Sequence, residues 1–223
     1  MHRQFEEELE EIKRTILSMA GLVEKCLDDI STALANHDNE LAEEVIAMDE
    51  EIDQCEVEID RLATEFIARH QPTATDLRFV IVAIKLGPEL ERIADNAVNM
   101  AERILHLSKY PLLKPLIDLP RMLGLAHAMV SDAIAAYVAR DGKAARDVIR
   151  RDDEVDALYM QIFRELLSYM IEDPKTISRA IDLIFIARYV ERIADQATNI
   201  SEEVVYLVEA KPIRHVYPIP ESL

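Results

Sequence analysis

Apolar residues recur at intervals of three and four along most of the chain, the spacing that places them on one face of an α-helix. Helix-breaking residues interrupt this pattern at five places: "NHDN", "QPT", "SKYPLLKPLIDLP", Asp141-Gly142 and "EDP". The sequence therefore predicts six long helices. Their ranges are about 4–35, 39–70, 75–107, 120–140, 142–172 and 175–209.

The six predicted helices fall into two groups of three, separated by the proline-rich segment "SKYPLLKPLIDLP". The simplest packing of such a pattern is an all-α fold of two tandem, pseudo-symmetric three-helix bundles, each running up, down and up. We expect a first bundle at 1–108, a linker at 109–119, a second bundle at 120–210 and an extended, proline-rich tail at 211–223.

One segment occurs twice, which supports the two-bundle interpretation. "ERIADNAVNMAERI" at 91–104 returns as "ERIADQATNISEEV" at 191–204, with eight of fourteen positions identical. Both copies place Glu, Asp and Asn one helical turn apart. These residues are Glu91, Asp95 and Asn99, and Glu191, Asp195 and Asn199.

Two further acidic pairs precede these repeats. The four pairs, each spaced i and i+4, are Asp49–Asp53, Glu91–Asp95, Asp152–Asp156 and Glu191–Asp195. In an antiparallel hairpin, residues equidistant from the turn lie level with each other. The midpoints of the pairs fall on Pro72 in the first hairpin and on the Asp173-Pro174 junction in the second. Each hairpin therefore brings four carboxylates to one height.

Stacked carboxylates of this kind predict a cation between the helices. Like charges one turn apart cost an isolated helix about 0.2–0.5 kcal/mol per pair. Ligation by oxygen alone suits Mg, Mn, Ca or Fe(III), and the amide oxygens of Asn99 and Asn199 can supplement the carboxylates. The alternative is that Arg92, Arg103, Arg192 and nearby lysines neutralise the stripes as surface salt bridges.

Net charge and missing motifs argue against several classes of function. The formal net charge of −18 argues against nucleic-acid binding. No continuous apolar run reaches the roughly 18 residues of a membrane span, so we expect a soluble, cytoplasmic protein. None of the six histidines has a Glu three residues before it, as helical di-iron enzymes require. We therefore expect no enzyme, and we interpret Tyr159, Phe163 and Tyr169 as packing residues.

One proline departs from this scheme. Pro88 falls inside the third predicted helix and has no N–H for the carbonyl of Ile84. We expect a kink there, with a new helical segment beginning just before Glu91.

The two long segments that carry the repeat resemble the signature helices of the PhoU family. They read "QPTATDLRFVIVAIKLGPELERIADNAVNMAERI" and "PKTISRAIDLIFIARYVERIADQATNISEEVVYLVEA". The resemblance covers almost the whole chain and implies two three-helix bundles with multinuclear clusters of Fe, Mn, Mg or Zn. It places the ligands at the four acidic pairs. Gly87-Pro88 and the aromatic residues of the fifth helix depart from the family pattern, so we expect the two clusters to differ.

The resemblance also implies a regulatory function. PhoU-like proteins contact the ATPase subunit of a phosphate ABC transporter and a sensor histidine kinase. They restrain phosphate uptake and phosphate-starvation genes when phosphate is plentiful. We expect the same of this chain, as a homodimer that is peripheral to the membrane only through its partners. The alternatives are a metal-dependent hydrolase or oxidase using the same carboxylates, and a purely structural bundle with acidic surface stripes.

Overall fold

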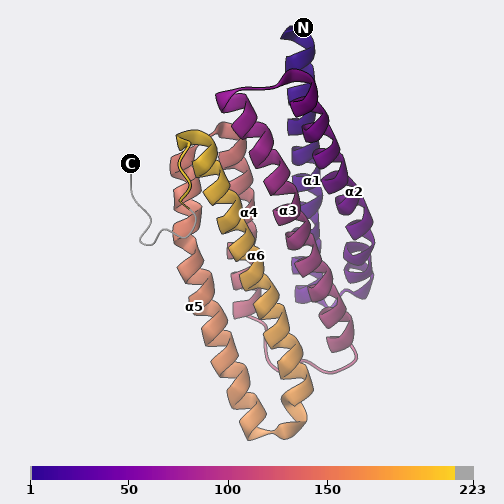
Figure 1. Cartoon of the computed structure of the whole chain (residues 1–223). Helices are drawn as coiled ribbons and strands as arrows, with labels where there is room; N and C mark the ends of the chain where they lie inside the picture. Colours follow the sequence, from indigo (N-terminus) through magenta and orange to yellow (C-terminus); the bar gives the residue numbers. More distant parts are fainter. Residues whose placement is uncertain (1, 214–223) are drawn as a thin grey trace.

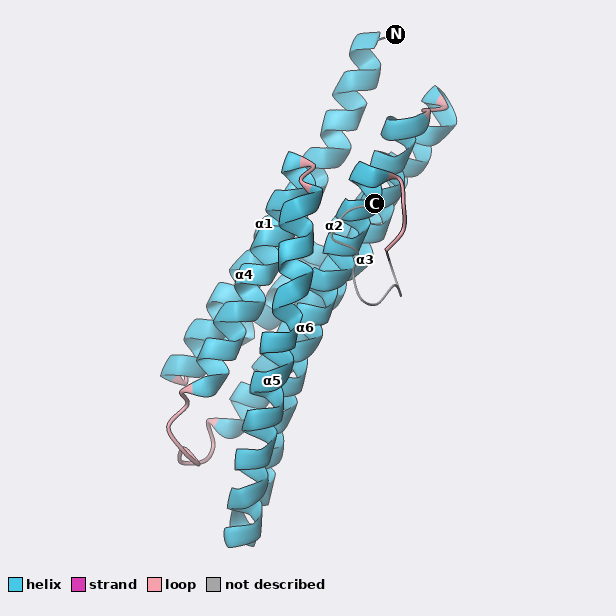
Figure 2. Ribbon diagram, turned by 90° about the vertical axis from the view of Figure 1, so that its left-hand side faces the viewer, coloured by secondary structure: helices cyan, strands magenta, loops and turns pink. Residues whose placement is uncertain are grey.

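The computed structural model describes residues 2–213, which form six α-helices and one short 3₁₀ turn (Figure 1). These are α1 (His2–Asn36), α2 (Asn39–His70), α3 (Ala74–Leu107), α4 (Asp118–Ala139), α5 (Gly142–Glu172), the turn Pro174–Thr176 and α6 (Ile177–Glu209). Helices and loops account for all of these residues (Figure 2). The prediction of an all-α fold with six long helices is confirmed. Most of the predicted tail, residues 214–223, lies outside the described residues.

Side-chain caps explain where two of the hairpins turn. Asp38 precedes α2 and its carboxylate accepts a hydrogen bond from the backbone N–H of Leu41. Asp141 caps α5 in the same way, accepting from Lys143 and Ala144. Such caps satisfy N–H groups that the first turn of a helix leaves without partners. Each predicted turn therefore ends one helix and starts the next.

The helices pack as two bundles that share one core. Helices α1, α2 and α3 contact one another, and α6 packs against both α4 and α5. The bundles meet where α3 packs against α6 and α1 against α4, as Figure 1 shows for α3 and α6. Buried side chains from all six helices form one continuous hydrophobic cluster. The domain boundaries at residues 108 and 120 therefore stay a prediction.

Polar contacts set the register between the bundles. Lys85, in the first half of α3, pairs with Glu203 at 2.8 Å. At the other end of α3, the Nδ1 atom of His106 donates to the buried carboxylate of Asp182 at 2.6 Å. Residue numbers thus rise along α3 while they fall along α6, so the two helices are antiparallel. This arrangement relates the bundles by approximate two-fold symmetry.

Helix α3 continues without a break through Pro88. The prediction of a new helical segment before Glu91 is therefore wrong. Proline removes one backbone hydrogen bond, but α3 is 34 residues long and packs against α1, α2 and α6. Leu86 and Leu90, on either side of the proline, are fully buried. Tertiary packing holds the helix together where its own hydrogen bonding is interrupted.

Among residues 2–213, one helix is long and apolar enough to cross a membrane by length and composition alone. This helix is α4, with a mean hydropathy of 1.4 over its best 18-residue window. Ser131 and Asp132 interrupt its apolar run, which is why the sequence showed no continuous span. In the structure α4 packs against α1, α5 and α6, and half of that window is buried.

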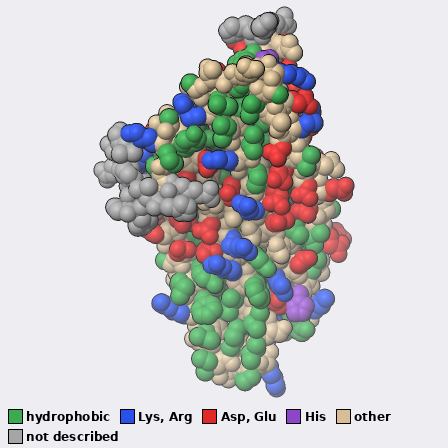
Figure 3. Space-filling view, viewed as in Figure 1, with side chains coloured by type: hydrophobic (Ala, Val, Ile, Leu, Met, Phe, Trp, Pro, Cys, Tyr) green, Lys and Arg blue, Asp and Glu red, His purple; other side chains and the backbone are tan. Residues whose placement is uncertain are grey.

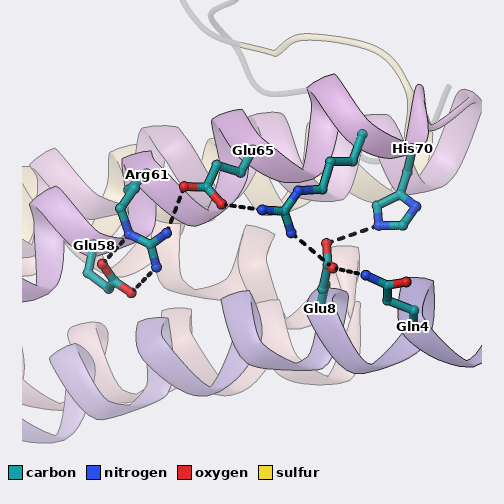
Figure 4. Close-up of polar contacts among 7 residues, drawn as sticks. Gln4, Glu8, Glu58, Arg61, Glu65 and His70 are labelled. Atoms are coloured by element: carbon teal, nitrogen blue, oxygen red, sulfur yellow. Dashed lines mark hydrogen bonds and ion pairs between the residues drawn. The ribbon is translucent and has the colours of Figure 1, made fainter.

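Some acidic residues on α1 and α2 pair with bases. The carboxylate of Glu8 accepts from Arg69 at 3.2 Å and from His70 at 2.9 Å, which joins α1 to α2 (Figure 4). Arg61 pairs with two glutamates of its own helix. Exposed pairs of this kind each contribute little to stability. They show how this chain neutralises an acidic surface when bases are available.

Candidate metal-binding site

The eight carboxylates of the predicted pairs lie on two hairpins. The first acidic cluster consists of Asp49 and Asp53 from α2 with Glu91 and Asp95 from α3, and the second of Asp152 and Asp156 from α5 with Glu191 and Asp195 from α6. Figure 3 shows acidic side chains gathered over α2 and α3, and a second group over α5 and α6. In each cluster one residue from each helix is half-buried and the other is exposed.

In the first acidic cluster, the carboxylates of α2 and α3 act on one another. Burial raises the pKa of Asp49, and the charges of Asp53 and Asp95 raise it further. Burial also raises the pKa of Glu91 to about 7, with additional contributions from Asp95, Glu56 and Asp53. Burial and like charges both penalise the ionised form. The two helices therefore bring mutually repelling carboxylates together.

The second acidic cluster is perturbed in the same way. Burial, followed by the charges of Asp195, Asp156 and Glu191, raises the pKa of Asp152 to about 7. The pKa values of Glu191 and Asp195 are also raised, again with burial as the first cause. Each hairpin thus holds negative charge that its surroundings disfavour.

Two oxygens of the second acidic cluster are buried without a partner in the described part of the chain. These are Oδ1 of Asp152 and Oε2 of Glu191. A buried polar atom without a hydrogen bond costs about 1–3 kcal/mol, and more when it is charged. Oxygen atoms of this kind fit a hard cation, which prefers carboxylate ligands. Among residues 2–213, no group of three acidic, histidine or cysteine side chains is already arranged to hold a metal ion.

Arginine side chains neutralise these clusters only in part. Arg92 pairs with Glu89 at 3.2 Å, and Arg103 pairs with Asp182 at 3.5 Å, so both contact carboxylates outside the clusters. Arg188 does pair with Glu191 of the second acidic cluster. Within the described residues this is the one ion pair that involves any of the eight carboxylates. The charges of Arg92, Arg188 and Arg192 lower the pKa values of Glu91, Glu191 and Asp195 without reversing the upward shift, so neutralisation is partial.

The two asparagines of the repeat have different surroundings. The amide of Asn99 donates to the backbone carbonyl of Asp95 at 2.6 Å, so it stays beside the first acidic cluster. The amide of Asn199 instead donates to the Glu89 carboxylate across the α3–α6 contact, at 3.2 Å. Glu89 is buried. Asn199 therefore links the two bundles in addition to lying one turn from Asp195.

Glu56 is a ninth carboxylate that the sequence prediction did not include. Its pKa is raised by burial and by Asp60 and Asp53, and its charge in turn raises the pKa of Glu91. Gly87 of α3 makes room for it, since a Cβ at Gly87 would lie 3.3 Å from Cγ of Glu56. In the sequence, Glu56 shares one helix face with Asp49, Asp53 and Asp60. At the matching position of α5 stands Tyr159, so the clusters differ in composition.

Comparisons with a family model, with related sequences and with solved structures all point to one family. The family model described as the PhoU domain matches residues 16–104 and 119–204. The "Phosphate-specific transport system accessory protein PhoU homolog" of Aquifex aeolicus is 43% identical over 208 residues, which cover 93% of this chain and 94% of that protein.

Two solved structures share the fold. The crystal structure of PhoU from Pseudomonas aeruginosa has a TM-score of 0.90 and 38% identity, covering 93% of this chain and all of the other. The structure of the phosphate transport system regulatory protein PhoU from Streptococcus pneumoniae has a TM-score of 0.86 and 28% identity. It covers 93% of this chain and 98% of the other.

Proposed function

The chain belongs to the PhoU family, and from that premise we propose that it is a metal-binding regulator of phosphate uptake and phosphate-starvation signalling. The names of its relatives support an accessory role in phosphate transport. The observation that carries the metal-binding part is the repeated cluster of four carboxylates, once per hairpin, in which burial and neighbouring charges raise the pKa of Glu91 and of Asp152.

The eight carboxylates are the proposed ligands. Asp49, Asp53, Glu91 and Asp95 would hold the first site. Asp152, Asp156, Glu191 and Asp195 would hold the second. A cation held by these residues would supply the positive charge that offsets their mutual repulsion. The oxygen-only ligand set favours a hard ion, and redox chemistry has no role in the proposal. Asn99 is a further oxygen ligand for the first site, and Asn199 for the second.

The protein's own residues would transmit the effect of the ion. In the metal-free state the carboxylates of a hairpin repel one another, which disfavours close packing of its two helices at that height. Charge neutralisation removes this repulsion. Asn199 contacts Glu89, two residues from Glu91, so the second site also touches the helix that carries the first. We therefore expect binding at one hairpin to be felt at the other through this contact.

The proposed partners are the ATPase subunit of a phosphate ABC transporter and a sensor histidine kinase. We place the protein in the cytoplasm, as a homodimer that reaches the membrane only through these partners. Contact with the ATPase would restrain uptake, and contact with the kinase would keep phosphate-starvation genes silent. In this account the protein regulates by binding and does not catalyse a reaction.

A reporter assay tests the regulatory function. A strain that lacks the gene for this chain should express a phosphate-starvation reporter even in phosphate-rich medium. The wild-type chain should restore repression, whereas the variant carrying Asp95→Ala and Asp195→Ala should fail to do so at equal protein level. The variant Glu43→Ala removes an exposed acid of α2 outside both clusters and serves as the control. Wild-type protein that leaves the reporter on would overturn the proposed function.

A further inference from the structure

The two acidic clusters share the same set of four carboxylates but differ in the side chains beside them. Positions 103 residues apart match between α2 and α5, and positions 100 residues apart match between α3 and α6. By this rule Glu56 of α2 corresponds to Tyr159 of α5, and Pro88 of α3 corresponds to Arg188 of α6. The first acidic cluster therefore has an additional acid where the second has a ring, and an uncharged residue where the second has an arginine.

Arg188 contacts both the second acidic cluster and the ring that borders it. Its guanidinium donates to Oε1 of Glu191, three residues farther along α6. The same guanidinium lies 5.8 Å from the ring centroid of Tyr159 on α5, in a cation–π contact. The side chain of Arg188 is 49% exposed, so water can solvate the guanidinium if it leaves Glu191. Arg188 is thus a positive charge at the cluster that can be exchanged for another.

The contact with Arg188 leaves other oxygens of the second acidic cluster unsatisfied. Oε2 of Glu191 and Oδ1 of Asp152 are buried and have no hydrogen-bond partner among residues 2–213. Buried polar atoms normally have such a partner, so these two oxygens are available to a cation. Because Arg188 contacts Glu191 directly, an ion bound to Glu191 and the guanidinium would repel each other. The arginine and the ion therefore compete for the same carboxylate.

Other arginines near the clusters do not produce this contrast. Arg92 and Arg192 stand at matching positions of α3 and α6, so each cluster has one of them nearby. Arg151 directly precedes the second acidic cluster on α5, but it pairs with Asp132 of α4 at 2.6 Å. The difference between the clusters in direct neutralisation therefore depends on Arg188.

The surroundings of the first acidic cluster act in the opposite direction. Burial and Asp95 raise the pKa of Glu91 most, and the charge of Glu56 adds to the shift. A further negative charge strengthens the attraction of the cluster for a cation. The position that holds Arg188 in the second bundle is Pro88 here, and the described part of the chain forms no ion pair with the four carboxylates of this cluster. A cation therefore meets more negative charge and has no ion pair to break.

We propose that Arg188 is a built-in counter-ion of the second acidic cluster, which a hard divalent cation must displace from Glu191 in order to bind there. The proposal rests on the proposed function, because it assumes that the clusters hold metal. It follows that the first site fills at a lower metal concentration than the second. The second site is then the one whose occupancy changes with the supply of metal, so the regulatory response to metal would come from the α5–α6 hairpin.

Titration of the metal-free full chain with Mn²⁺ tests the order of filling. Isothermal titration calorimetry measures the dissociation constant of each site. The variant Asp95→Ala leaves only the second site intact, and Asp195→Ala leaves only the first. The expected result is a dissociation constant at least tenfold lower for the first site than for the second. Equal constants, or a tighter second site, would overturn the order of filling.

Substitutions of Arg188 test the displacement itself. Made together with Asp95→Ala, Arg188→Gln removes the charge and should lower the Mn²⁺ dissociation constant of the second site by about threefold or more. Arg188→Lys keeps the charge and should stay within about twofold of the parent, as charge repulsion requires. The control Arg150→Gln removes an exposed arginine of the same hairpin and should also change the constant by less than about twofold, because its ion pair is with Asp147, outside the cluster.

Failure of this inference and failure of the proposed function give different results. An unchanged or higher dissociation constant for Arg188→Gln would overturn the inference while metal binding itself stands. A wild type that binds no Mn²⁺ at either cluster would contradict both. Circular dichroism and urea unfolding establish that each metal-free variant folds. If Asp95→Ala does not fold, Arg188→Gln is compared with wild type in the weaker of the two binding steps, with the same expected change and the same contradicting result.

Discussion

Replacing Asp152 with asparagine should stabilise the metal-free protein near pH 7.5. Burial and neighbouring carboxylates raise the pKa of Asp152 from 3.8 to about 7. Above that pH the group is ionised in both states, so the folded state carries the full cost of the charge. A shift of about three pKa units corresponds to about 4 kcal/mol. Because Asp152 is half-buried and solvent screens part of this cost, we expect a gain of about 1–2 kcal/mol.

Urea unfolding in the presence of a chelator measures this gain. The Asp152→Asn variant should show a higher midpoint than wild type with an unchanged slope. The control Glu43→Gln should stay within about 0.5 kcal/mol of wild type, because Glu43 is exposed and lies outside both clusters. Lowering the pH from about 8 to about 5 should stabilise wild type more than the variant. A raised carboxyl pKa means that the folded state takes up a proton first in this range.

Added metal should reverse the order of the two proteins. An ion that binds only the folded state stabilises it by RT ln(1 + [L]/Kd), where [L] is the concentration of free ion and Kd is its dissociation constant. Wild type should therefore gain more from the metal than Asp152→Asn, which lacks one carboxylate ligand. A variant less stable than wild type in chelator would contradict repulsion between Asp152 and its neighbouring carboxylates. Equal gains from metal in both proteins would remove Asp152 from the ligand set.

Three further substitutions test the packing, each by urea unfolding. Gly21→Ala in the middle of α1 should stabilise by about 0.5–1 kcal/mol, because the added Cβ meets nothing within 4 Å; a loss would contradict the helix geometry. Glu209→Gln should destabilise by about 1–2 kcal/mol, because the Glu209 carboxylate accepts from buried Arg146 at 2.9 Å. Arg146 lowers the pKa of Glu209, so the ion pair should stabilise wild type above about pH 4.5 and be lost as the pH falls further. The Glu209→Gln variant should not show this loss. Asp182→Asn should cost about 1–3 kcal/mol, since it weakens the contact with His106 that joins the bundles; an unchanged midpoint would argue that α3 and α6 do not meet there.

The antiparallel hairpins could be predicted from the sequence because short turns fix the register of the helices that they join. Pro72 and the Asp173-Pro174 junction each centre two acidic pairs. From this the sequence predicts which carboxylates share a height, and in the structure carboxylates from both helices raise one another's pKa. The register of such a hairpin depends on a short segment of the chain, so it can be predicted from the sequence.

Features that depend on packing between distant segments were not predicted. The continuity of α3 through Pro88 depends on three neighbouring helices that no local pattern reveals. Phe163, interpreted as a packing residue, contacts the ring of Tyr159 but is 36% exposed, because no other helix among residues 2–213 covers the outer side of the hairpin. The role of Glu56 depends on the space above Gly87, which exists only once α2 packs against α3.

Metal content per chain tests the central claim most directly. Elemental analysis of protein purified without an affinity tag would compare wild type with the variant carrying Asp95→Ala and Asp195→Ala. The account predicts stoichiometric metal in wild type and its loss in the variant, while Glu43→Ala retains it. Wild-type protein without metal, or a variant that keeps all of it, would contradict the assignment of the acidic clusters as metal sites.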